Sequence, residues 1–363
     1  MTQLWSRKRF STVSTTSLER TARHWGVEGS WALDRGSYWS ELPAVQRRLN
    51  AKVSGDPDVD WVAYTLRTHL SALLPVERCL SLGCGRGGLE RYLADLHVFT
   101  SCDAYDVAPT CIAEARQLAE ERGYRHIHYA VADINQMELP GKVYDVVWVH
   151  AAMHHFERLE RVCTQIQHSL KPEGLLVLND YVGPSRFQFP SRQREACQAA
   201  FMCLPPRYRR LADQRAEEMG ARTLGRRGLR WVMERFWDKL QDGDLLATMA
   251  RHWAAWRASR SGEAFIKEFS LPTARDVAAG DPSEAIRSAD ILEVVSRFFT
   301  VIDHKDLGGT LLQFVLDGIA CNFDDDDPQV GRLLELLFQV EDTLLAVGDL
   351  QSDFVYLVAR PKC

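Results

Sequence analysis

A short apolar run that ends in a cluster of glycines constrains the fold more than any other feature of this chain. The segment "CLSLGCGRGG" (79–88) predicts a buried strand, a tight turn and the start of a helix that continues as "LERYLADL". Gly83 can adopt a backbone conformation that a β-carbon would forbid, and Gly85 allows the chain to approach a ligand closely. The free N–H groups at the helix start suit a polar or anionic group. The glycines fit both G-x-G-x-x-G and G-x-G-x-G, so the turn predicts a nucleoside-type cofactor without choosing its class.

Strand-like and helix-like segments alternate from about residue 77 to residue 182. Five short apolar runs are expected as strands, namely "RCLSLG", "HVFTSCDAYDV", "HIHYAVADI", "YDVVWVHA" and "GLLVLNDYV". Amphipathic helical segments lie between them, such as "PTCIAEARQLAEERG", which has Pro near its start and Gly at its end. This alternation is typical of right-handed βαβ units in a doubly wound α/β fold with a parallel sheet.

The flanking regions differ in character from this alternating core. We predict an N-terminal helical extension (1–75), a cofactor-binding core (76–183), a helical cap or lid insertion rich in Arg and Trp (184–285) and a C-terminal completion of the core (286–363). In the last region, an amphipathic segment near 331–347 could serve a homodimer interface.

Charge and hydropathy narrow the expected partners. The formal net charge of −5 does not favour general binding to nucleic acid or to an anionic membrane. The first residues lack the apolar stretch of a signal peptide, and no run approaches the roughly 18 apolar residues of a membrane helix. The nine cysteines contain no CxxC pair. These features predict a cytoplasmic protein with reduced thiols and with no membrane or nucleic-acid partner.

From the glycine turn onward, the chain resembles the class I S-adenosylmethionine-dependent methyltransferases. The segments that carry the resemblance are "CLSLGCGRGGLERYLA", "AYDVAPTCIAEAR", "AVADINQMELP", "YDVVWVHAAMHHF" and "SLKPEGLLVLNDY", in the order and approximate spacing of the family. Sixth and seventh strand candidates lie near 299–305 and 353–360. The resemblance implies a Rossmann-like seven-stranded sheet and S-adenosylmethionine as the cofactor.

The resemblance also implies roles for single residues. Gly83 and Gly85 would lie against the methionine part of the cofactor, and His150 would lie near the same end. The ribose hydroxyls would bind an acidic residue at the end of the second strand, where Asp103 and Asp106 are both candidates and the downstream register favours Asp106. Around the adenine, the resemblance implies Asp133 as acceptor for the exocyclic amine and Ile134 as a packing surface.

The double histidine in "MHHFE" (153–157) follows the fourth strand, and Asp180 ends the fifth. Because neighbouring parallel strands end at the same edge of a sheet, we expect His154 and Asp180 to meet there. A carboxylate can orient an imidazole and stabilise its protonated form, which makes a general base. The spacing of this pair resembles that in methyltransferases acting on sugar hydroxyls of natural products. We therefore predict O-methylation of a small molecule, such as a sugar or polyketide-type natural product, with His154 and Asp180 as base and partner. His155 is expected to be a helix-start residue whose side chain points the opposite way.

No metal site is predicted, because adjacent histidines do not easily face one ion and no Cys or Glu completes a familiar ligand spacing. Other acceptors stay open: N- or C-methylation of a small metabolite, or RNA bound by the Arg-dense segment near 207–230. A non-catalytic cofactor-binding regulatory protein is the alternative outside enzymes. An NAD oxidoreductase fits the glycines but not the segments after the strands.

Overall fold

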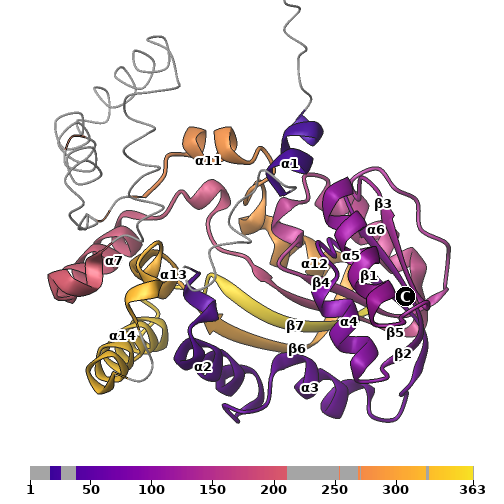
Figure 1. Ribbon diagram of the computed structural model, residues 1–363, viewed down its shortest axis with the longest axis horizontal. Helices are drawn as coiled ribbons and strands as arrows, with labels where there is room; N and C mark the ends of the chain where they lie inside the picture. Colours follow the sequence, from indigo (N-terminus) through magenta and orange to yellow (C-terminus); the bar gives the residue numbers. More distant parts are fainter. Residues whose placement is uncertain are drawn as a thin grey trace, which may run out of the picture.

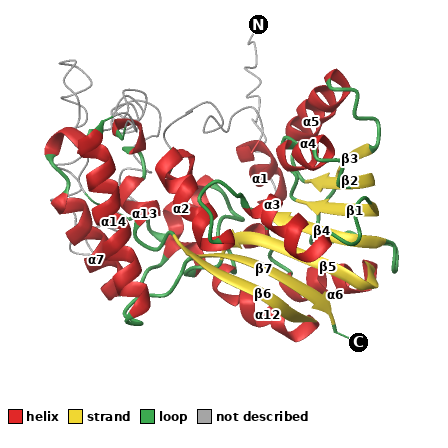
Figure 2. Ribbon diagram, turned by 90° about the horizontal axis from the view of Figure 1, so that it is seen from below, coloured by secondary structure: helices red, strands yellow, loops and turns green. Residues whose placement is uncertain are grey.

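The computed structural model describes residues 17–25, 38–210, 253, 269, 271–323 and 327–362. Most of the predicted cap insertion (184–285) therefore lies outside the described residues. The described chain contains a twisted sheet with helices on both faces and a separate group of helices beyond one end of the strands (Figures 1 and 2).

Seven strands form one mixed sheet in the order β3-β2-β1-β4-β5-β7-β6, and β7 runs antiparallel to its neighbours β5 and β6. The strands are β1 (Val76–Leu82), β2 (Phe99–Asp106), β3 (Ile127–Val131), β4 (Tyr144–His150), β5 (Leu170–Tyr181), β6 (Phe299–Gly308) and β7 (Phe354–Pro361). The predicted Rossmann-like seven-stranded sheet is confirmed, including its two C-terminal strands. From β1 the successive strands β2 and β3 are added on one side, whereas β4 and β5 are added on the other. Ligands of such folds bind outside the carboxyl ends of the strands at this switch point between β1 and β4.

Alternating side chains of the central strands build two cores, one on each face. On β4, Val146 and Trp148 face one side, while Val147 and Val149 face the other. The first face is covered by α2 (Pro43–Ser54), α3 (Trp61–Thr65), α4 (Gly88–Asp95) and α5 (Pro109–Glu121), and the second by α6 (Leu159–Ser169) and α12 (Ile291–Phe298). Both faces of the parallel strands are thus buried, which explains why these strands are continuous apolar runs in the sequence.

Local signals set the helix ends. Helix α5 has Pro109 at its first position, where the missing N–H costs no hydrogen bond, and Gly123 follows its end with φ of 75°. Helix α3 begins after Asp60, whose carboxylate accepts a hydrogen bond from the backbone N–H of Ala63.

A third apolar cluster lies beyond the sheet and joins α7 (Ser191–Cys203), α13 (Leu312–Leu316) and α14 (Pro328–Ala346) (Figure 2). Phe201, Val315 and Leu334 are buried in it, and Trp39 from the N-terminal region packs against them. The outer face of α14 leaves Leu336 and Val340 exposed. In the part of the chain that the structure describes, no helix is both long and apolar enough to cross a lipid bilayer.

Candidate functional site

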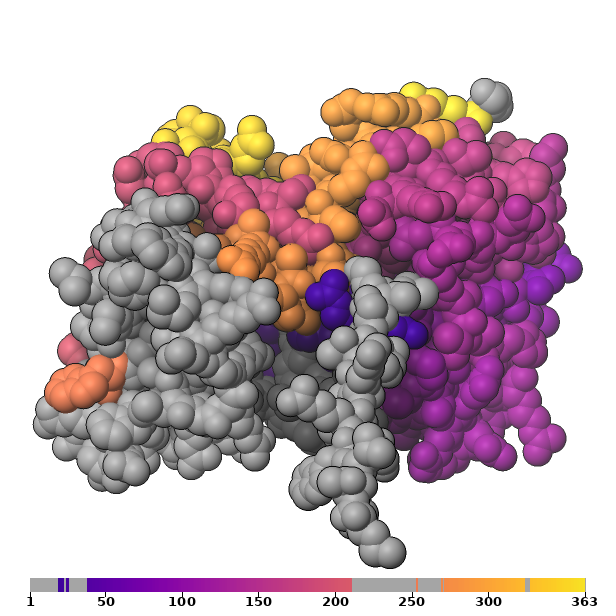
Figure 3. All heavy atoms as spheres, turned by 90° about the horizontal axis from the view of Figure 1, so that it is seen from above, coloured from indigo at the N-terminus to yellow at the C-terminus, as the bar shows by residue number. Residues whose placement is uncertain are grey.

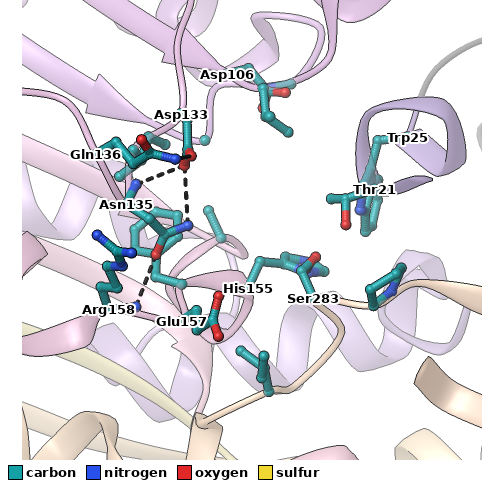
Figure 4. A pocket seen from close by; sticks show the side chains of 18 of the residues that line it. Thr21, Trp25, Asp106, Asp133, Asn135, Gln136, His155, Glu157, Arg158 and Ser283 are labelled. Carbon is teal, nitrogen blue, oxygen red and sulfur yellow. Dashed lines mark hydrogen bonds between the residues drawn. The ribbon is translucent and has the colours of Figure 1, made fainter. Parts of the chain in front are cut away.

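A cavity of about 330 Å³ opens at the carboxyl ends of β1, β2 and β4, which is the position that the strand order predicts for a ligand. Its wall comes from the glycine turn, the segments that follow β2, β3 and β4, and two distant segments, helix α1 (Ser17–Trp25) and residues 282–286 (Figure 4). The predicted residues Gly83, Gly85, Asp106, Asp133 and Ile134 all line it.

The glycine turn follows β1 and brings the backbone to the cavity. Gly83 and Gly85 have φ values of 73° and 51°, in the left-handed region that favours glycine. A β-carbon on Gly83 would lie 2.3 Å from the β-carbon of Ala152, which is an impossible contact. Gly83 is therefore required both by its backbone conformation and by the close approach of the chain after β4.

The two acidic candidates at the end of β2 lie in different surroundings. Asp103 is buried inside the sheet, where its carboxylate accepts hydrogen bonds from the Arg78 guanidinium and, at 2.8 Å, from the Tyr144 hydroxyl. Asp106 lines the cavity, and its two oxygens accept from the backbone N–H groups of Gly85 at 2.9 Å and Ala108 at 2.8 Å. The carboxylate of Asp106 thus ties the glycine turn to the start of α5 and still has lone pairs for a ligand.

The segment after β3 forms another part of the cavity wall. The Asp133 carboxylate accepts hydrogen bonds from the side-chain amide of Gln136 at 2.7 Å and from the backbone N–H of Asn135 at 3.0 Å (Figure 4). Ile134 is buried beside it and presents an apolar surface to the cavity. A carboxylate beside an apolar side chain suits an aromatic base that carries an amine.

His150 ends β4, but it is not one of the described residues that line this cavity. Its ring centroid lies 5.1 Å from that of Trp61, and its Nδ1 lies 3.3 Å from the carbonyl oxygen of Asn179. Its contacts are therefore with α3 and β5, and the predicted contact with the cofactor stays a prediction.

His154, in the turn after β4, and Asp180, near the end of β5, meet as the sequence predicted. The Nδ1 of His154 lies 2.5 Å from Oδ1 of Asp180, and the other oxygen of Asp180 accepts from the backbone N–H groups of Ala152 and Met153 at 2.9 and 2.6 Å. The side chain of Asp180 is fully buried, so this carboxylate fixes both the turn after β4 and the orientation of the imidazole. His154 is itself 11% exposed and lies next to, but not on, the cavity wall.

His155 corrects one prediction. The expectation that its side chain points away from that of His154 is wrong, because the two ring centroids are only 4.1 Å apart. Residues Met153–His155 form a 3-10 turn and not an extended strand, so consecutive side chains need not alternate between opposite sides. His155, which was expected to be scaffold, is the histidine that lines the cavity (Figure 4).

A carboxylate that the sequence did not indicate completes the group. Oε1 of Glu284 lies 3.6 Å from Nε2 of His154, and Oε2 lies 4.0 Å from Nε2 of His155. The loop that carries Glu284 is held by Arg186, whose guanidinium donates to the carbonyl oxygens of Pro282 at 2.6 Å and Glu284 at 2.9 Å. This part of the predicted cap region thus places an acid beside the double histidine.

Helix α1 closes one side of the cavity through a single buried acid. Asp281 accepts hydrogen bonds from Thr21 at 2.9 Å and from the indole N–H of Trp25 at 2.7 Å. The Trp25 ring also meets that of His155 edge to face, with 5.0 Å between centroids. Figure 3 shows the indigo atoms of α1 between the orange and the magenta parts of the chain. Sequence reasoning missed Thr21, Trp25 and Asp281, since no local motif marks a contact between segments 256 or more residues apart.

The known proteins that resemble this chain include methyltransferases. A sequence profile described as "Methyltransferase domain" matches residues 80–178. The chain is 31% identical over 121 residues to malonyl-[acyl-carrier protein] O-methyltransferase of Enterobacter lignolyticus (32% of this chain, 45% of the relative). It is 28% identical over 128 residues to 27-O-demethylrifamycin SV methyltransferase of Amycolatopsis mediterranei (32% and 44%). The chain therefore spans less than half the length of these curated relatives.

Among solved structures, an S-adenosylmethionine-dependent methyltransferase from Mesorhizobium loti aligns with 82% of this chain and 96% of its own, at 18% identity and a TM-score of 0.37.

Proposed function

We propose that this chain, whose residues 80–178 match the methyltransferase-domain profile, is a class I S-adenosylmethionine-dependent methyltransferase. Its substrate would be a hydroxyl of a small molecule such as a sugar or polyketide-type natural product. One observation carries the proposal: the carboxylate-bound imidazole of His154 lies beside the cofactor cavity, and its Nε2 makes no hydrogen bond within 3.5 Å to a described residue. Two of the relatives are named as methyltransferases that act on oxygen, which supports the choice of a hydroxyl.

The cavity fits the cofactor of this family. Gly83 allows the turn to pack closely against Ala152, and Gly85 borders open space. Both line the cavity and would lie against the methionine part of the cofactor. Asp106 would accept the ribose hydroxyls, and Asp133 with Ile134 would hold the adenine. When bound, S-adenosylmethionine supplies an electrophilic methyl group on a sulfonium.

The histidine–carboxylate pair supplies the proton acceptor. Since Nδ1–H of His154 donates to Asp180, the lone pair on Nε2 is free to take a proton from an acceptor hydroxyl. The Asp180 carboxylate then stabilises the imidazolium. The 3.6 Å gap between Nε2 and Glu284 is too long for a hydrogen bond, so a hydroxyl can compete for this nitrogen.

The proposal is tested by binding and product analysis. We expect calorimetry to detect S-adenosylhomocysteine binding, and mass spectrometry to detect a hydroxylated sugar or polyketide that gains one CH₂ unit when incubated with the protein and S-adenosylmethionine. Extracts of the native host with and without this chain provide the acceptor panel. Failure to bind S-adenosylhomocysteine would overturn the methyltransferase assignment, whereas binding without transfer to any acceptor would favour a regulatory protein.

The pH dependence of transfer follows from the surroundings of His154. Burial lowers the pKa of His154, but the Asp180 carboxylate and the nearby Glu284 and Asp281 carboxylates outweigh it and raise the pKa to about 8. Because only the neutral imidazole accepts a proton, kcat/KM should rise with pH and level off above about pH 8. The profile is measured from pH 6 to 9.5 with chelator present; a rate that is flat or falls across this range would contradict the base assignment.

A further inference from the structure

Three potential ligand atoms converge beside the cavity, from His154, His155 and Glu284. All lie within 4.8 Å of one another, and their side chains are 11%, 14% and 16% exposed. Two of the residues are adjacent in the turn after β4, while Glu284 comes from the loop that Arg186 holds. The arrangement is therefore a buried meeting point of two chain segments and not a cluster of surface acids.

Hydrogen bonds on the far side of each ring determine which nitrogen faces this meeting point. Nδ1 of His154 must carry its proton because it faces the Asp180 carboxylate at 2.5 Å. Nδ1 of His155 lies 3.0 Å from the Ser283 hydroxyl oxygen, and that hydroxyl donates to Asp281 at 2.9 Å. Ser283 must then accept from His155, so His155 is also protonated on Nδ1. Both histidines consequently direct their Nε2 atoms toward Glu284.

No donor among the described residues satisfies the Nε2 of His155, which is buried and lacks a hydrogen-bond partner. Metal binding requires both imidazoles to be neutral. In that state two nitrogen lone pairs and a carboxylate face one another, which is unfavourable without a cation between them.

We propose that His154, His155 and Glu284 form a binding site for a divalent transition-metal ion, with Zn²⁺ as the ion that fits best. Two imidazoles and one carboxylate with an open position are a common ligand set for zinc, whereas Mg²⁺ and Ca²⁺ prefer oxygen ligands. Metal-bound histidines usually donate their other ring N–H to a carboxylate or another acceptor, as both do here. Of the three residues, His155 also lines the cavity.

The spacing requires only small movements. Tetrahedral ligands about 2.1 Å from zinc lie about 3.4 Å apart. The present separations, 3.6 Å from Nε2 of His154 to Oε1 of Glu284 and 4.0 Å from Nε2 of His155 to Oε2, are slightly longer than this value. A rotation of the Glu284 side chain would bring one oxygen toward both nitrogens, while Asp180 and Ser283 hold the rings in place.

Zinc at this site would occupy the Nε2 lone pair that the proposed function assigns to the base. Metal binding and proton acceptance by His154 therefore exclude each other, and excess Zn²⁺ should suppress methyl transfer until a chelator removes it. Zinc binding that leaves transfer undiminished would support the metal site and overturn the base assignment, so the two proposals fail independently.

The test uses the full chain, freed of metal by dialysis against a chelator and titrated with ZnCl₂ by calorimetry. We expect one tight site per chain, with Kd below about 1 μM. In Glu284→Gln and His155→Asn, binding should weaken by at least about 100-fold. The control Glu138→Gln makes the same change on an exposed carboxylate and should bind as the parent does. Thermal unfolding verifies that each variant is folded.

A second control is needed for the exposed thiols of Cys203 and Cys321, because thiolates can also bind zinc. Titration with Co²⁺ distinguishes them, because thiolate ligands produce intense near-ultraviolet charge-transfer absorption and imidazole–carboxylate ligands do not. Stoichiometric Co²⁺ binding without that absorption, lost in Glu284→Gln, is the expected result. The site is overturned if the parent shows no such binding, or if Glu284→Gln and His155→Asn bind zinc as tightly as Glu138→Gln.

Discussion

His154→Asn should lower kcat for methyl transfer by about 10²–10⁴-fold while the affinity for S-adenosylhomocysteine stays unchanged. Asparagine can retain a donor near the position of Nδ1, so the hydrogen bond to the buried Asp180 and the turn that Asp180 holds are preserved. It removes Nε2, the atom proposed to accept the proton. Steady-state kinetics with a reactive acceptor and calorimetry with S-adenosylhomocysteine measure the two effects separately.

The matched control is His128→Asn, the same substitution on the exposed side of β3. It should leave both kcat and cofactor affinity as they are. Full turnover in His154→Asn would show that the acceptor loses its proton elsewhere, and the role of Asp180 would then be limited to holding the turn.

Asp106→Asn should weaken S-adenosylhomocysteine binding by on the order of 100-fold. Both oxygens of this carboxylate accept backbone N–H groups, from Gly85 and Ala108. An amide offers one oxygen and places its NH₂ against the second N–H donor, which disturbs the glycine turn. It would also remove one of the two oxygens proposed to accept the ribose hydroxyls. Calorimetry gives the change in Kd directly.

Asp103→Asn is the matched control that separates an effect on cofactor affinity from an effect on stability. It makes the same substitution three residues earlier on the same strand. Asp103 contacts Arg78 and Tyr144 inside the sheet and is not part of the cavity wall. This variant should lower the unfolding temperature with little change in Kd. Equal losses of affinity in both variants would mean that Asp106 acts through the fold and not on the ribose.

The parts of the site that were predictable belong to continuous stretches of chain. A strand, its following turn and the next helix are set by neighbouring residues, so Gly83, Gly85 and Asp106 could be placed from the glycine pattern and the Pro109 helix start. The meeting of His154 and Asp180 was also predictable, since β4 and β5 are parallel neighbours whose ends coincide.

By itself, then, the sequence determined the α/β core, the glycine turn and the pair at the sheet edge, because these follow from local periodicity and strand pairing. Only the tertiary structure decided that His155 faces the cavity, that Asp281 ties helix α1 to it, and that Glu284 joins the two histidines. The physical reason is sequence distance. Glu284 lies 129 residues after His155, and no periodic pattern specifies how a loop that far along the chain folds back onto a turn.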